Sequence, residues 1–295
     1  MHGERRAQRS LQRLLGATLC RVDVVPDLAT ATIDEDTIVV VDSAIAMTAL
    51  DACKRDARAW IAVPGEGLQP ADPPAVSALL QAGWDHVVAH PMPLLAEELL
   101  ATAQKLIRRD CFGLEKYMVW GAEVRAFQLE DAVERDAAVT AIASDVTRVG
   151  LPDRIGSLVS VIADELLANA LYAAPVDEHG ARHRAHDPRD RSRPLEGRDA
   201  VTLRWSTDGR YLAIEVRDRW GSIEPAAIEG RLATTKTSTA EGGMGLPLAY
   251  ACSNQLVVNV APGALTEVIA LLDIRYKPTE LARSASFHAF WGDPP

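Results

Sequence analysis

The sequence has few cysteines, a shortage of positive charge and no long apolar run, and each shortage excludes a class of protein. Its four cysteines, Cys20, Cys53, Cys111 and Cys252, are too far apart for a zinc pattern or an evident disulfide framework. We expect them to be reduced and buried as small hydrophobes. Acidic residues outnumber Lys and Arg by 41 to 31, and the net charge of −10 argues against a general affinity for nucleic acid.

No uninterrupted apolar run approaches the roughly 20 residues that a membrane helix needs. The start of the chain, residues 1–10, is too charged for a secretory signal. We therefore expect a cytoplasmic protein without a membrane or nucleic-acid partner. A chain of 295 residues with 48% hydrophobic content can bury a sizeable core, and this length suggests two domains.

Residues 1–110 predict a parallel α/β domain. Short apolar strands are expected at 38–41, 59–63 and 86–89, and helices at 5–15, 75–81 and 94–107. Strands that alternate with helices imply a parallel sheet, since parallel neighbours need a crossover connection.

Residues 111–295 predict helices layered on a mixed sheet. An edge strand is expected at 124–129, helices at 131–149 and 154–174, and two hairpins built from strands 201–205, 211–216, 255–260 and 267–274. Between the second helix and the first hairpin, residues 176–200 have almost no apolar side chains, so we expect a mobile loop. Its histidines, His179, His183 and His186, would not be held convergent there, and no metal site is expected from them.

The predicted helix 154–174 carries Glu165 and Asn169 four residues apart, on one face. A carboxylate can orient water, and an amide oxygen is a suitable ligand for magnesium, which takes few protein ligands beside phosphates and waters. Asparagine is a poor helix former, so its place within Leu-Leu-Ala-Asn-Ala-Leu favours a functional role over a solvated helix face.

Two further motifs lie beside predicted strands and helices. Asp218 ends a strand just before Gly221, where its carboxylate could accept a hydrogen bond from an exocyclic amine such as that of adenine; a plain turn explains it equally well. Gly243 and Gly245 precede a helix, where backbone N–H groups and the helix dipole favour phosphate. A loop hinge is the alternative for these two glycines.

Taken in order, the motifs resemble the N, G1 and G2 boxes and the closing strand of the GHKL (Bergerat-fold) ATPases, over residues 120–275. The layout is most similar to anti-sigma-factor serine kinases and the ATP-binding domains of histidine kinases. The resemblance implies a helix-on-mixed-sheet sandwich that binds ATP and Mg. It implies that Glu165 is the general base, Asn169 the magnesium ligand, Asp218 the adenine-reading aspartate, Gly221 the G1 glycine, Gly243 and Gly245 the phosphate-side glycines, and Thr266 the threonine near the adenine.

Departures from the family pattern keep two functional classes open. Trp220 and Ser222 stand where G1 glycines are expected, and Ala173 stands where the serine kinases often have histidine. We expect the Trp220 indole to stack on the base or seal the pocket edge. One alternative is a signalling protein that binds Mg-ATP and phosphorylates a serine or threonine of a partner regulator. The other is an inactive module that docks or sequesters a signalling protein; a homodimer is compatible with either.

The front domain resembles a response-regulator receiver. Residues 81–91 are similar to the end of its fourth helix, its fifth strand and the proline that follows. His90 replaces the receiver lysine, and no strand with an acidic pair precedes Asp42, which stands at the phosphoacceptor position. Without these groups an acyl phosphate would have neither magnesium nor charge neutralisation. We predict a degenerate receiver-like domain in which Asp42 is structural.

Overall fold

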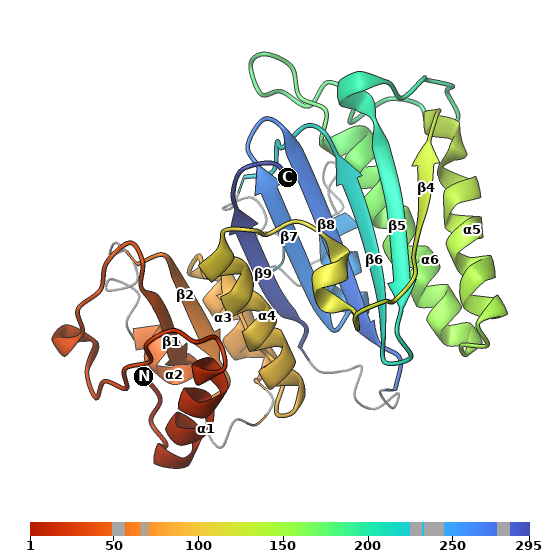
Figure 1. Cartoon of the computed structure of the whole chain (residues 1–295). Helices are drawn as coiled ribbons and strands as arrows, with labels where there is room; N and C mark the ends of the chain where they lie inside the picture. Colours follow the sequence, from red (N-terminus) through yellow and green to blue (C-terminus); the bar gives the residue numbers. More distant parts are fainter. Residues whose placement is uncertain (49–56, 66–68, 70, 225–231, 233–244, 276–283) are drawn as a thin grey trace.

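The computed structural model describes residues 1–48, 57–65, 69, 71–224, 232, 245–275 and 284–295, and all statements below concern these residues. They form one nine-stranded sheet in the order β1-β2-β3-β9-β7-β8-β6-β5-β4 (Figure 1). The strands are β1 (Ile38–Asp42), β2 (Ala59–Val63), β3 (His86–Val87), β4 (Val124–Leu129), β5 (Val201–Thr207), β6 (Tyr211–Asp218), β7 (Gln255–Ala261), β8 (Leu265–Asp273) and β9 (Ser286–Trp291).

Helices cover both faces of the sheet. They are α1 (Arg5–Gly16), α2 (Ser43–Thr48), α3 (Pro73–Gln81), α4 (Leu94–Arg108), α5 (Arg135–Arg148), α6 (Asp153–Ala168) and α8 (Gly245–Cys252), and α6 continues into the π-helical turn η6 (Asn169–Ala173). Buried side chains of α2, α3, α5, α6 and α8 belong to one large core, whereas α1 and α4 pack over β2 in a separate cluster. The mixed α/β class expected from the sequence is confirmed.

The predicted strand pairing is largely correct. Strands β1, β2 and β3 pair in parallel, and β4, β5, β6, β8 and β7 are antiparallel neighbours, with β4 at the edge as expected. Strand β3 is shorter than predicted. The Ala89 amide, which would have continued it, donates to the Ser286 hydroxyl at 2.8 Å.

Strand β9 was not expected, and it joins the two predicted domains. It pairs antiparallel with β3 and parallel with β7, so residues from before 110 and after 111 share one sheet. A buried carboxylate strengthens this junction, because Glu98 of α4 lies between His90 (2.9 Å) and His288 of β9 (2.8 Å). Burial opposes ionisation of Glu98, but hydrogen bonds from His288 and His90 hold its pKa at about 2.

The segment between α4 and β4 is attached to the sheet face opposite α5 and α6 (Figure 1). It includes the 3-10 turn η4 (Leu114–Tyr117), and the Gly113 and Leu114 amides donate to the buried carboxylates of Glu267 and Glu215, each at 2.9 Å. Burial, and then the neighbouring Glu267, raise the pKa of Glu215 to about 7. The connection after residue 110 is therefore part of the packed structure.

The structure bears on two expectations drawn from the composition, one about membrane helices and one about the burial of the cysteines. The continuous helical stretch Asp153–Ala173 is long and apolar enough to cross a membrane by length and composition, and half of its most apolar 18-residue window is buried inside the protein. Cys111 is buried and Cys252 is half-buried, but the expectation of burial is wrong for Cys20, which is exposed. The fourth, Cys53, lies outside the described residues.

Candidate functional site

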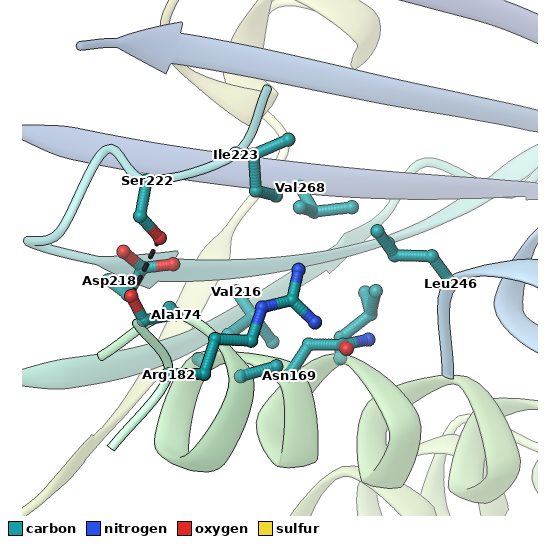
Figure 2. A pocket seen from close by; sticks show the side chains of 12 residues that line it. Asn169, Ala174, Arg182, Val216, Asp218, Ser222, Ile223, Leu246 and Val268 are labelled. Carbon is teal, nitrogen blue, oxygen red and sulfur yellow. Dashed lines mark hydrogen bonds between the residues drawn. The ribbon is translucent and has the colours of Figure 1, made fainter. Parts of the chain in front are cut away.

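A pocket opens between the end of α6 and the strands β6 and β8 (Figure 2). Its cavity volume is about 40 Å³, and most of its lining is apolar. The polar side chains in the lining are Asn169, Arg182, Asp218 and Ser222. An apolar pocket with a few convergent polar groups is the usual form of a small-molecule site.

Asn169 lies where the α-helix α6 gives way to the π-turn η6. Its amide nitrogen donates to the Glu165 carbonyl at 3.0 Å, which uses the nitrogen and leaves the carboxamide oxygen as the acceptor that a cation requires. Such π-turns inside helices are frequent at functional sites, because they redirect side chains. The structure therefore brings the predicted magnesium ligand to the pocket.

Glu165 lies one helical turn before Asn169 and is not among the residues that line the pocket. It is half-buried, and burial raises the pKa of its carboxyl, with a further contribution from Asp164. Asp164 itself forms an ion pair with Arg135 at 2.5 Å. A carboxylate with a raised pKa is better suited to accept a proton than an ordinary one.

Asp218 ends β6 and lies beside Thr266 of β8 in the antiparallel register. Its carboxylate accepts a hydrogen bond from the Trp220 amide at 2.8 Å. Burial nevertheless raises the pKa of Asp218 to about 7, although hydrogen bonds from the Trp220 and Gly221 amides act to lower it. The Thr266 hydroxyl is fully buried beside this carboxylate and stabilises it, but makes no hydrogen bond of ordinary geometry among the described residues.

Gly221 is explained by packing alone. Its φ is +56°, and a Cβ there would lie 2.7 Å from the backbone nitrogens of both Gly263 and Ala264 and would collide with the Ala261 carbonyl. Only glycine fits this close approach of two turns. Gly221 is not among the residues that line the pocket, and the next residue, Ser222, donates its hydroxyl hydrogen to the Ala174 carbonyl at 2.6 Å.

The indole of Trp220 packs under the 176–200 loop and does not line the pocket. It is buried, with the Arg198 guanidinium 4.4 Å from its ring centroid and the His183 ring 6.0 Å away. Two hydrogen bonds between Arg184 and Asp199, of 2.6 and 2.7 Å, tie the loop to itself nearby. Whether this loop is mobile stays a prediction.

Only part of the third motif, the glycines before α8, lies within the described residues. Gly243 lies outside the described residues, whereas the backbone of Gly245 begins α8 and the next residue, Leu246, lines the pocket. Sequence reasoning missed Arg182, whose side chain enters the pocket from the 176–200 loop (Figure 2). Its one signal in the sequence was its place in a loop that directly follows the Asn169 helix.

No known protein family matches the sequence, and a comparison with curated proteins finds no match either.

Asp42, at the end of β1, is a buried carboxylate. Asp42 is 4% exposed and accepts hydrogen bonds from the amides of Gly3 (2.6 Å) and Ile45 (2.9 Å). His90, at the position where the predicted resemblance has a lysine, points to Glu98 and is also 3.0 Å from the Ser286 hydroxyl. The Asp42 carboxylate and the His90 ring therefore both have partners within the protein.

Proposed function

We propose that this chain binds Mg-ATP through a GHKL-type domain and acts in signal transduction. The observation that carries the proposal is the convergence of Asn169 and Asp218, from a helix and a distant strand, on one apolar pocket. These are the two residues that the resemblance assigns to magnesium and to adenine. A degenerate receiver-like front half completes the proposal.

The adenine would lie at the Asp218 end of the pocket. The Asp218 carboxylate can accept from an exocyclic amine, and the fully buried Thr266 lies behind it without lining the pocket. Val216 and Val268 supply apolar walls for the base. Buried polar groups of this kind discriminate strongly against ligands that leave them unpaired.

The phosphates would lie at the Asn169 end, where the oxygen of Asn169 fits one ligand position of magnesium. Bound magnesium would neutralise charge on the transferring phosphate. Glu165, whose pKa is raised, would take the proton of a partner's serine or threonine hydroxyl. The oxygen of that hydroxyl would bond to the γ-phosphorus as ADP leaves. Phosphorylation of a protein partner is the finer part of the proposal.

Calorimetry with the full chain tests nucleotide binding. The full chain is needed because β9 pairs with β3, so removal of residues 1–110 would uncover a sheet edge. We expect saturable heat with Mg-ATP and much less with Mg-GTP, which lacks the exocyclic amine at the adenine position. An absence of heat at millimolar nucleotide overturns the proposal.

Asp218→Asn is the matched variant for the adenine contact. The asparagine side chain can turn its NH2 toward the amine of adenine, so that two donors face each other. The affinity for Mg-ATP should therefore fall about tenfold. Asp208→Asn, in the turn between β5 and β6 and away from the pocket, is the control and should bind as the parent does. Equal affinity in the Asp218 variant removes this residue from the pocket chemistry.

A further inference from the structure

We infer that Arg182 forms an anion subsite in this pocket and contacts the polyphosphate chain of the nucleotide. The assignment of the anion to a nucleotide rests on the proposed function, but the subsite itself rests on Arg182 alone. Neither the GHKL-like motifs nor the pattern of the predicted strands includes this residue. It comes from the loop that follows the Asn169 helix.

A hydrogen-bonded turn fixes the backbone of Arg182. Residues Val176 and Arg182 form an antiparallel bridge, and the Asp177 amide donates to the Ala181 carbonyl at 2.9 Å. The Asp177 side chain accepts from the amides of His179 and Ala181, both at 2.9 Å. This turn closes directly after η6, so the Arg182 side chain extends into the pocket over Asn169 and Val216 (Figure 2).

Four other arginines of the 176–200 loop are engaged by the protein. Arg184 pairs with Asp199, and Arg193 pairs with Asp187 and donates to the Leu171 carbonyl. Two more lie over aromatic rings, Arg189 over Tyr172 at 3.8 Å and Arg198 over Trp220 at 4.4 Å.

Arg182 differs from these neighbours. It is exposed at the mouth of the pocket and makes no ion pair or side-chain hydrogen bond within the part of the chain that the structure describes, even though Asp218 lines the same pocket. It is also the one cation among the described lining residues. A guanidinium is charged at all accessible pH values and carries five donors and no acceptor, in a planar fork that matches phosphate. Its ligand in the pocket is therefore an anion.

The remaining polar groups of the lining favour a phosphate chain over a carboxylate-bearing ligand. Asn169 offers an oxygen that suits a magnesium ion bound to phosphates, and it lies below Arg182 in the same view (Figure 2). A Mg-polyphosphate presents both the cation for Asn169 and the anionic oxygens for Arg182. A simple carboxylate would satisfy Arg182 only.

The experiment titrates Mg-ATP, adenosine and Mg-tripolyphosphate against the parent and against Arg182→Ala, Arg182→Lys and Arg191→Ala. Arg191 is an exposed arginine of the same loop that does not line the pocket, so it controls for the loss of loop charge. We expect Arg182→Ala to weaken Mg-ATP and Mg-tripolyphosphate at least tenfold with adenosine unchanged, Arg182→Lys to lose less, and Arg191→Ala to match the parent. Melting curves of all four proteins check that the folds are equal.

The outcomes separate the subsite from the proposed function. If Arg182→Ala keeps the parent affinity for Mg-ATP, or loses as much for adenosine as for ATP, the subsite is overturned and nucleotide binding stands. If the parent binds tripolyphosphate through Arg182 but neither adenosine nor ATP, the subsite stands and the proposed function fails. If the parent binds none of the three, both are overturned.

Discussion

The carbonyl oxygen of Gly221 accepts a hydrogen bond from the amide of Gly263 at 3.0 Å, so the turn after β6 lies directly on the turn between β7 and β8. No atom of a side chain fits between these turns. The contact fixes the direction in which the chain leaves Asp218. The Asp218 end of the proposed site, where adenine would lie, therefore depends on a turn more than 40 positions further along the sequence.

Gly221→Ala should destabilise the protein. The left-handed backbone alone costs an alanine about 1–2 kcal/mol, and the collision with the Ala261 carbonyl adds to this cost. Gly209→Ala is the matched control, because Gly209 has φ +81° but a Cβ added there would meet nothing within 4 Å. Urea unfolding should show a clearly larger loss for Gly221→Ala; equal losses would mean that the two turns are not in contact.

Asp218 should make stability depend on pH. Its folded-state pKa of about 7 lies above the ordinary value, so the folded protein binds a proton that the unfolded chain has released between about pH 4 and 7. The contribution of Asp218 is thus fully present at low pH and is lost as the pH rises through 7. Relative to Asp218→Asn, the free energy of unfolding of the parent should fall by about 2–3 kcal/mol between pH 5 and 8.

Urea unfolding of both proteins at the two pH values measures this difference, and other titrating groups cancel because the two chains share them. A difference between parent and variant that does not change with pH would show that Asp218 titrates as an ordinary surface carboxyl.

Asp42 should resist phosphorylation. Its carboxylate is buried and accepts hydrogen bonds from two backbone amides, and no lysine stands at the position now held by His90. Incubation with a small acyl phosphate and magnesium, followed by intact-mass measurement, should leave the mass unchanged. A stoichiometric adduct that disappears in Asp42→Ala would show that Asp42 accepts phosphate and that this prediction is wrong.

Trp220 should matter for stability more than for nucleotide contact. Its indole is buried against Arg198 and His183 of the loop and does not line the pocket, so Trp220→Ala should cost about 3 kcal/mol of stability. Trp220→Phe keeps an aromatic face for Arg198 and should cost less. Adenosine affinity should be similar in Trp220→Phe and the parent; a large loss of affinity in this variant would favour an indole that stacks on the base.

Local periodicity was enough to predict most of the fold. The strands 59–63 and 201–205 and the helix 94–107 are each an apolar pattern bounded by turn residues, and each was found within a few positions of its predicted place. Asn169 could be nominated because an asparagine inside an apolar helix is unusual without a function. Asp218, which a plain turn explains equally well by itself, was nominated from its place in the order of the motifs. Their meeting in one pocket supports that reasoning.

The parts that were missed depend on distant residues. Strand β9 is six residues long and buried on both faces, so it shows no alternation, and its partner β3 is about 200 positions earlier. Arg182 looked like one more charge in a polar loop, since only the turn at residues 177–181 directs it inward. Gly221 was assigned to the ligand although its partners, in the turn after β7, are sufficient to require glycine.

The position of β9 has a consequence for how the protein is made. It follows every other strand of the described sheet in the sequence, and until it has left the ribosome β3 and β7 are edges without a neighbour between them. Each half can form its local helices and hairpins during synthesis, but the central pairing must wait for β9. Exposed edges in the nascent chain invite pairing with other chains, so aggregation during expression should be most sensitive to residues 286–291.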